Sequence, residues 1–216
     1  MIIKIFVKFR KFLHVLYATF DSYTEMTSNF RIVEATKEAR YEIFLYKCLS
    51  PIPFRRSSFT TELLWAKLKI EYCPADVAPY PISCEEKCVI MSCIWVLRKA
   101  KGHGFGKALM NKMLKEHKDA VGFATIGFEG HWSPCFKRWQ MEKLGFKPID
   151  SVEVRHKIRH KEQTFKIFPM WLPWKSASAK SSWNKKEMLK GVDFCLAHPL
   201  YRAEKYGDTE ILKFAR

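Results

Sequence analysis

The chain has 216 residues, of which 48% are hydrophobic and 28% are charged, a composition typical of a soluble globular protein of one domain with an appendage. Its net charge of +16 favours anionic partners. The seven cysteines, an odd number in mostly apolar surroundings, argue against a disulfide framework and indicate reduced thiols in a cytoplasmic protein.

The first twenty residues are basic and apolar, but they match neither a membrane span nor a signal peptide. Their uncharged run, 12–20, is too short to cross a bilayer, and no clean small-residue cleavage site follows it. The residues from Met26 resemble a natural protein start that leads into a first strand. We therefore expect residues 1–25 to be an extension upstream of the native chain. The alternative is an amphipathic surface helix with weak membrane affinity.

Four elements are expected between this start and the middle of the chain. Thr36 precedes a helical pattern, and its side chain suits an N-cap. The residues up to Tyr72 alternate in polarity, which is typical of a strand. The expected elements are a strand at 30–35, a helix at 37–47, a loop at 50–58 and a strand at 63–72.

The most informative segment is rich in glycine and lies between a predicted strand and a predicted helix. The apolar run Val89–Leu97 precedes the segment Lys101–Gly106, and a helical pattern of apolar residues follows. Glycines allow positive φ and a close approach of the backbone to a ligand. The first turn of a helix offers unpaired N–H groups and the positive end of the helix dipole. This order predicts a phosphate site. The alternating glycines fit neither the dinucleotide fingerprint nor the P-loop, and a turn without a ligand is the alternative.

A second buried strand, 121–128, and a short helix ending near Leu144 follow the predicted phosphate site. Gly145 is a natural helix stop, and Pro148 prevents the helix from resuming. Beyond it we expect a hairpin, a loop and a last helix. These are strands 149–157 and 164–171 around a tip at 159–163, a loop at 172–186, and a helix at 185–195 capped by Asn184.

Two motifs resemble those of the GNAT (GCN5-related) N-acetyltransferase family. Lys101-x-x-Gly104-x-Gly106 is similar to the pyrophosphate-binding motif Gln/Arg-x-x-Gly-x-Gly/Ala, and Glu142–Phe146 (Glu-Lys-Leu-Gly-Phe) is similar to the end of a later family motif. The resemblance covers residues 88–150. The wording at 70–75 and 93–96 looks like a prokaryotic, mostly archaeal branch.

The resemblance implies a GNAT fold of the α/β (α+β) class, with a central mixed, mostly antiparallel twisted sheet flanked by helices. Residues 26–172 would form this domain and residues 173–216 a C-terminal accessory segment. Between Phe30 and Cys93 the chain looks short for the family pattern, so one strand or helix is expected to be missing there.

The resemblance also implies acetyl-CoA as cosubstrate and direct transfer of its acetyl group to a primary amine. The backbone of 93–96 would bind the pantetheine arm, and a splayed strand pair, 93–96 and 123–128, would make the cleft. The N–H groups of 102–107 would hold the pyrophosphate. The residues implied in cofactor binding are Cys93, Ile94, Trp95, Val96, Lys101, Gly102, His103, Gly104, Phe105, Gly106, Lys107 and Ala108.

Two residues depart from the family pattern. Lys101 replaces the usual Gln or Arg and lacks a forked donor geometry. Met141 stands where many members carry a tyrosine that is thought to protonate the departing thiolate. Cofactor binding is expected to survive both changes. The group that would protonate the departing thiolate is left open, and so is whether the protein turns over.

Four residues are candidates for moving protons. Glu71 lies on a strand beside the expected cleft, and an outward-facing carboxylate is the favoured alternative. Glu129 and His131 follow the next strand; an imidazole has a pKa suited to proton relay, and a plain loop pair is the alternative. Cys135 follows Pro134 at a helix start, where the pKa of a thiol tends to fall, with packing as the favoured alternative.

Two other functions stay open beside acetyl transfer. The net charge and the basic, aromatic segment 155–190 favour a nucleic-acid-binding module, although no recognised nucleic-acid motif is present. The methionine at 141 favours a CoA-binding regulator without turnover. Cys84-x-x-x-Cys88 has no matching second pair, so no metal site is predicted, and no membrane partner is expected.

Overall fold

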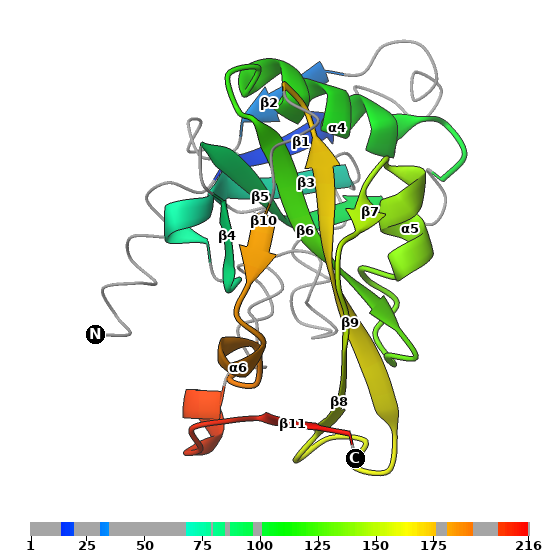
Figure 1. Cartoon of the computed structure of the whole chain (residues 1–216). Coiled ribbons are helices and arrows are strands. Elements are labelled where there is room, and N and C mark those ends of the chain that lie inside the picture. Colours follow the sequence, from blue (N-terminus) through cyan, green and yellow to red (C-terminus); the bar gives the residue numbers. More distant parts are fainter. Residues whose placement is uncertain are drawn as a thin grey trace.

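The computed structural model describes residues 14–19, 31–34, 68–78, 80–84, 87–96, 101–175, 181–191 and 203–215. In this part of the chain nine strands form one sheet in the order β11-β8-β9-β6-β5-β3-β1-β2, with β7 paired to β9 (Figure 1). The strands are β1 (His14–Thr19), β2 (Arg31–Glu34), β3 (Leu68–Pro74), β5 (Cys88–Val96), β6 (Gly122–Glu129), β7 (Lys147–Pro148), β8 (Val152–His156), β9 (Thr164–Pro173) and β11 (Leu212–Phe214). The helices are η3 (Ala75–Val77), α4 (Phe105–Glu116), α5 (Arg138–Lys143), α6 (Lys185–Met188) and η6 (Ala203–Tyr206).

The sheet is mixed, and β5 and β6 form the one parallel strand pair among its described strands. The other neighbours pair antiparallel. Parallel neighbours need a crossover connection, and α4 supplies it between β5 and β6. This confirms the expected fold class, a mainly antiparallel mixed sheet flanked by helices.

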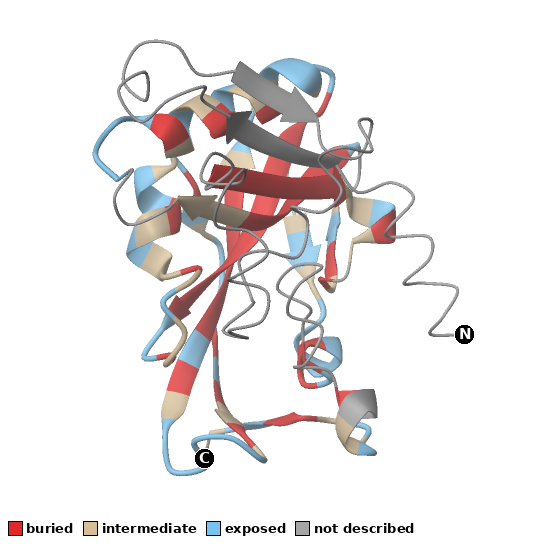
Figure 2. Ribbon diagram, turned by 180° about the vertical axis from the view of Figure 1, so that it is seen from behind, coloured by how far each residue is buried: buried red, intermediate tan, exposed pale blue. Residues whose placement is uncertain are grey.

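The core lies around the central strands, which are buried almost throughout (Figure 2). The apolar runs of β5 and β6 suit strands covered on both faces. The helix α4 lies over one face and buries Phe105, Leu109 and Met113, because its apolar residues recur at helical spacing. At its C-terminal end the Tyr72 hydroxyl donates to the Glu116 carboxylate at 2.5 Å. None of the described helices is long and apolar enough to cross a bilayer.

The segment expected to be an N-terminal extension contributes a strand to the sheet. His14–Thr19 pairs antiparallel with β2 on one side and with β3 on the other. A helix is therefore wrong for residues 14–19. Strand pairing over a long separation is not visible in the local pattern, because an edge accepts any strand of suitable register. In the sheet this strand lies between β2 and β3, two strands that come from the segment 30–93, where the chain looks short.

Several other predicted elements are confirmed. The strand at 30–35 is present as 31–34, and the strand at 63–72 is described from Leu68 onward. The hairpin of β8 and β9 has the expected antiparallel register, with Val154 opposite Phe165. The predicted helix at 37–47 with its cap Thr36 and the loop at 50–58 lie outside the described residues.

The C-terminal segment is more structured than expected. Ser181–Trp183 forms β10, which pairs with β4 (Ile82–Cys84), where a loop was predicted. Asn184 caps α6 as predicted, its side chain accepting from two backbone N–H groups. The helix ends at Met188, earlier than predicted, and Gly191 follows with a φ of 84°. The chain then adds β11 to the edge of β8, so this segment contributes strands to both described sheets (Figure 1).

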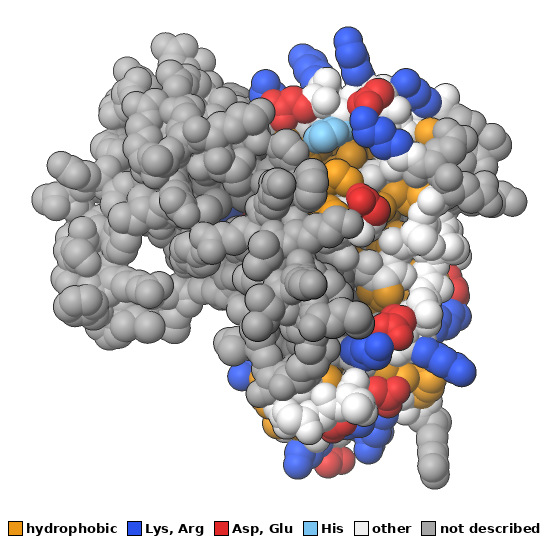
Figure 3. Space-filling model, turned by 90° about the vertical axis from the view of Figure 1, so that its left-hand side faces the viewer, with side chains coloured by type: hydrophobic (Ala, Val, Ile, Leu, Met, Phe, Trp, Pro, Cys, Tyr) orange, Lys and Arg blue, Asp and Glu red, His pale blue; other side chains and the backbone are white. Residues whose placement is uncertain are grey.

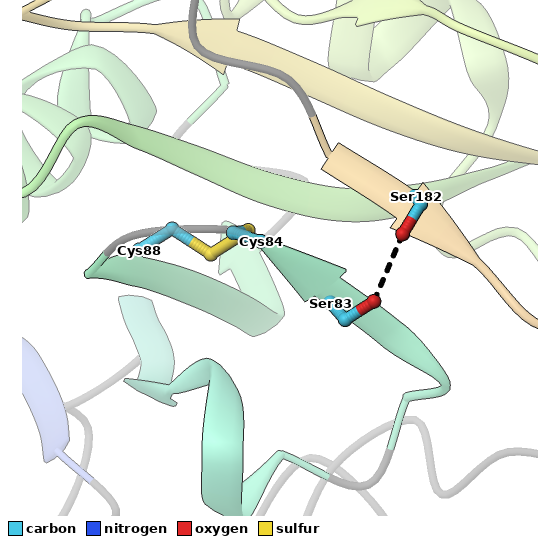
Figure 4. Close-up of a disulfide and its surroundings, with 4 residues drawn as sticks. All are labelled: Ser83, Cys84, Cys88 and Ser182. Carbon is cyan, nitrogen blue, oxygen red and sulfur yellow. Dashed lines mark hydrogen bonds between the residues drawn. A yellow bond between two sulfur atoms is a disulfide. The ribbon is translucent and has the colours of Figure 1, made fainter.

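Cys84 and Cys88 form a disulfide (Figure 4). The expectation of reduced thiols throughout is wrong for this pair, because the short connection from β4 to β5 brings the two Cα atoms to 6.3 Å, within bonding range. Beside the disulfide, the hydroxyls of Ser83 and Ser182 lie 2.9 Å apart across the β4–β10 pair. Among the described cysteines, Cys73, Cys93 and Cys135 lie outside this disulfide.

Candidate active site

The glycine-rich loop forms an exposed turn that leads into α4. Gly102 and Gly104 have φ of 88° and 75°, left-handed values that favour glycine. A Cβ added at either would meet nothing within 4 Å, so the loop is open on that side. Lys101 and His103 are exposed beside them. In Figure 3, Lys and Arg side chains gather along the upper end of the described surface, the end where Figure 1 shows α4.

The first turn of α4 has the geometry of an anion site. Gly104 is the N-cap and offers no side-chain cap. The first intrahelical bond runs from the Ala108 N–H to the Gly104 carbonyl at 3.0 Å. The N–H groups of 105–107 therefore have no acceptor within the helix, and the helix dipole favours negative charge at this end. A Cβ at Gly106 would lie 3.7 Å from the Val96 side chain, so this turn packs on the end of β5.

The parallel strands β5 and β6 part after three paired positions. Cys88, Val89 and Ile90 pair with Gly122, Phe123 and Ala124, and the described register ends there. At the next position the Thr125 hydroxyl donates to the Met91 carbonyl at 2.8 Å in place of a ladder bond. The edge of β5 beyond Met91 thus turns away from β6, and the residues expected to bind pantetheine, 93–96, lie on this edge. The predicted splaying of the two strands is confirmed.

A β-bulge at Ser92 marks the point where the strands part. Glu71 of β3 pairs with Cys93, but its neighbour Tyr72 pairs with Met91, so Ser92 is the extra residue. The Tyr80 hydroxyl donates to the Ser92 carbonyl at 3.1 Å and holds the bulge. Bulges bend the strand and recur next to active sites. Sequence reasoning missed this feature, and its one local signal is a small polar residue inside an apolar run.

The loop after β6 returns along the edge of β6 that faces β5. One edge of Phe128 is occupied by β9, so its parallel bridge to Lys137 uses the other edge. The Phe128 N–H donates to the Phe136 carbonyl at 2.6 Å. Phe136 has a φ of 56°, unusual for a residue with a side chain. The loop 130–137, which contains Cys135, therefore borders the far end of the parting strands.

Glu71 is fully buried, so the expected outward-facing carboxylate is wrong. Its carboxylate forms an ion pair with Lys69, two residues away on the same face of β3 and nearly as buried. The alternation of charged and apolar residues suggested a solvent-facing side, but β3 is covered on both faces. As the cross-strand partner of Cys93, Glu71 lies next to the bulge.

Glu129 lies at the surface at the end of β6. Its carboxylate is 3.4 Å from the Arg138 guanidinium, which also contacts Glu142 at 2.8 Å. The helix α5 that carries Arg138 supplies this pairing, which is typical of a solvated surface network. Nothing in this arrangement directs the carboxylate toward the parting strands.

His131 is a buried, stacked imidazole. Its ring stacks on Trp132 at 4.0 Å and on Phe128 at 4.8 Å between centroids, and its Nδ1 accepts from the Ser133 N–H at 3.0 Å. Burial, aided by the positive charge of Lys137, lowers the pKa of His131 to about 3. The expected pKa suited to relay is therefore wrong, because desolvation disfavours the imidazolium.

The candidate proton donors lie in apolar surroundings. Cys135 is half-buried and outside the disulfide, and its N–H donates to the Ser133 hydroxyl at 3.2 Å. Met141 is 2% exposed and packs into the core, and a thioether has no proton to donate at this position. Burial, with nearby carboxylates, raises the pKa of the Cys73 thiol.

The described residues contain no group of three or more His, Cys, Asp or Glu side chains able to hold a metal.

No protein-family model and no curated protein matches the chain. Among solved structures, a GNAT-family protein from Desulfovibrio desulfuricans is 16% identical, with a TM-score of 0.39 over 52% of this chain and 65% of its own. NAA60 from Arabidopsis thaliana, in complex with acetyl-CoA, is 15% identical, with a TM-score of 0.36 over 55% of this chain and 72% of its own.

A third structure, the ribosomal-protein-S18-alanine N-acetyltransferase from Escherichia coli, is 13% identical, with a TM-score of 0.34 over 76% of this chain and 96% of its own. The chain spans just under two thirds of the length of the Desulfovibrio protein. Each overlap is partial and of low identity, so these structures assign no function to this chain.

Proposed function

We propose that this chain is an N-acetyltransferase that moves an acetyl group from acetyl-CoA directly to a primary amine. The observation that carries the proposal is that three features lie along β5 and the start of α4. They are the exposed glycine turn at the start of α4, the parting of β5 and β6, and the bulge at Ser92. A Cβ at Gly106 would lie 3.7 Å from the Val96 side chain, which supports a position of the glycine turn near the open end of the parted strands.

The geometry suits the two ends of acetyl-CoA. Its diphosphate would bind the N–H groups of 105–107, with Lys101 and Lys107 exposed nearby to balance the charge. The pantetheine arm carries two amides, and an extended chain with amides can pair with a free strand edge. Beyond Ile90 the described pairing of β5 with β6 ends, so the arm could lie along β5 here and bring the thioester to the bulge.

Of the candidate bases, Glu71 has the best position. It lies beside the bulge, whereas Glu129 is exposed and paired with Arg138, and His131 is stacked in the core. The Glu71 carboxylate forms an ion pair with Lys69, and a carboxylate is the group that would accept a proton from the amine. A thiol has an ordinary pKa of about 8.5. The thiolate can therefore depart without a proton donor at position 141, where methionine cannot supply one.

Calorimetric titration with acetyl-CoA and with CoA tests the cofactor half of the proposal. We expect saturable binding of both ligands. Binding should be weaker for pantetheine fragments, which lack the diphosphate. A thiol-release assay with acetyl-CoA over a panel of amines then tests turnover. Binding without thiol release on any amine would favour the CoA-binding regulator, which Met141 motivates.

A nucleic-acid-binding module is the second candidate, favoured by the charge of +16. It would gain support if RNA bound tightly, with a steep dependence on salt, while CoA bound no better than at millimolar concentrations. The identity of the amine is a separate question, since the fold provides only the cofactor half of the active site.

A cytoplasmic location and membership of a prokaryotic, mostly archaeal branch stay predictions.

A further inference from the structure

The disulfide between Cys84 and Cys88 joins two sheets whose described strands share no backbone pairing. Cys84 ends β4, which pairs only with β10 among the described strands, and Cys88 begins β5 of the main sheet (Figure 4). Cys88 is 2% exposed and pairs with Gly122 of β6, so its side of the bond is fixed in the core. Cys84 is only half-buried. The bond therefore clamps the end of the small sheet to the main sheet.

Two neighbouring serines of β10 lie on opposite faces of the small sheet. Ser182 is opposite Ser83, and their exposed hydroxyls lie 2.9 Å apart (Figure 4). Ser181 is opposite Cys84, so the two side chains share the other face. Directly opposite residues of an antiparallel pair have Cβ atoms about 4.5–5.5 Å apart, close enough for a hydrogen bond between their side chains.

The Ser181 hydroxyl is satisfied better by the reduced form of Cys84 than by the disulfide. Its Oγ is buried and has no hydrogen-bond partner among the residues that the structure describes, and such a group costs free energy because it has given up its bonds to water. In the disulfide the Cys84 sulfur is held toward Cys88, whereas a reduced Cys84 can rotate toward Ser181. A thiolate accepts a hydrogen bond more strongly than a neutral sulfur. Ser181 thus favours the open form, while closure of so short a loop favours the disulfide only weakly.

We propose that Cys84 and Cys88 form a redox-sensitive clamp, which a dithiol reductant opens and whose open form Ser181 stabilises. In the open form the end of β4 separates from β5. Ile82, which is 4% exposed and packs in the core, keeps the rest of the small sheet in place. This inference goes beyond the proposed acetyl transfer and does not depend on it.

The clamp opens by two thiol–disulfide exchanges. A thiolate of the dithiol attacks the sulfur of Cys84, the more exposed residue, and the Cys88 sulfur leaves with the electron pair and takes up a proton. The second thiol of the reductant then loses its proton and attacks the reductant's own bonded sulfur. Cys84 leaves as a thiolate, to which Ser181 donates. Two electrons pass from the dithiol to the two cysteines, and the reductant carries the new disulfide.

The test compares the two neighbouring serines of β10 in the full chain. The parent, Ser181→Ala and Ser182→Ala are equilibrated with mixtures of reduced and oxidised dithiothreitol and then alkylated, and mass analysis gives the redox state of Cys84 and Cys88. We expect Ser181→Ala to need a ratio of reduced to oxidised dithiothreitol about 2-fold to 10-fold higher for half-reduction, because its open form lacks the hydrogen bond.

Two variants serve as controls. Ser182→Ala should match the parent, since its hydroxyl is paired with Ser83 whether the clamp is open or closed. Ser181→Thr keeps a hydroxyl at the position and should match the parent as well.

Hydrogen exchange locates the structural change. On reduction of the parent we expect faster exchange in β4 and β10, with β6 and β9 as protected as before. The double variant Cys84→Ser, Cys88→Ser should show this pattern without any reductant. It provides the test in the case in which Ser181→Ala does not fold.

Three results would overturn the proposal. The first is the same half-reduction ratio for the parent and Ser181→Ala. The second is exchange in β4 and β10 that does not change on reduction. The third is a rise in exchange as large in β6 and β9 as in β4, which would make the disulfide a support of the whole fold rather than a local clamp.

Discussion

The turn before α4 offers a prediction in which two neighbouring glycines should respond in opposite ways. Gly104 has a φ of 75°, whereas Gly106 has no positive φ and lies in the first turn of the helix. A Cβ at Gly104 would touch nothing within 4 Å, so Gly104→Ala acts through the backbone alone. Holding an L-residue in the left-handed region costs about 1–2 kcal/mol.

This conformational cost of Gly104→Ala can appear as lower stability or as weaker binding. If the loop keeps its shape, Gly104→Ala lowers the free energy of unfolding by about 1–2 kcal/mol. If the loop relaxes instead, the N–H groups of 105–107 lose their common direction, and acetyl-CoA binding weakens by up to the same energy. Since about 1.4 kcal/mol is tenfold in affinity, we expect a loss of about 5-fold to 30-fold.

Gly106→Ala is the matched control. Its new Cβ would lie 3.7 Å from the Val96 side chain, an ordinary contact. Alanine is favoured over glycine within a helix by roughly 0.5–1 kcal/mol, so this variant should be more stable and should still bind. Calorimetry with CoA and urea unfolding measure both quantities. Equal behaviour of the two variants would refute the reasoning that ties binding to the left-handed turn.

Three further predictions concern buried or cross-linked groups. Lys69→Met leaves the Glu71 carboxylate buried without its ion-pair partner and should lower the free energy of unfolding by about 3–5 kcal/mol, whereas joint replacement with Glu71→Leu should recover much of it; equal losses in urea unfolding would contradict the buried pair. The pKa of His131 is about 3 in the folded protein and higher when unfolded, so its contribution to stability is complete above about pH 6.5 and is lost as the pH falls toward 3. His131→Phe should flatten this part of the stability–pH curve, and an unchanged acid limb would contradict the depressed pKa. Cys84→Ser removes the disulfide that closes a short loop to Cys88 and should lower the free energy of unfolding by about 2 kcal/mol; a thiol-blocking mass shift on the peptide that carries Cys84 and Cys88, in the unreduced protein, would show that the bond is absent.

Local chemistry made part of the candidate site predictable. The alternation of glycines at 102 and 104 marks a left-handed turn whatever surrounds it, because only glycine adopts such φ without a penalty. The helix after it follows from apolar residues at helical spacing. The cap at Asn184 is predictable for the same reason: it depends on local sequence, because the side chain accepts from the N–H groups two and three residues later.

The candidate catalytic residues were harder to place, because their environment comes from other segments. The sequence shows an ordinary imidazole at His131, whereas burial in the core, aided by the positive charge of Lys137, lowers its pKa. Glu71 alternates with apolar neighbours, yet both faces of its strand are covered. A local pattern records polarity and spacing, while solvent exposure depends on what packs above.

The sequence by itself determined the elements around the glycine turn, because turn geometry, helix periodicity and capping depend on residues a few positions apart. Only the tertiary structure decided the position of β1 between β2 and β3, the bulge at Ser92 and the disulfide of Cys84. Each of these depends on register between strands that the chain brings together from a distance. Register is set by the packing of the whole sheet, and no short window of residues contains it.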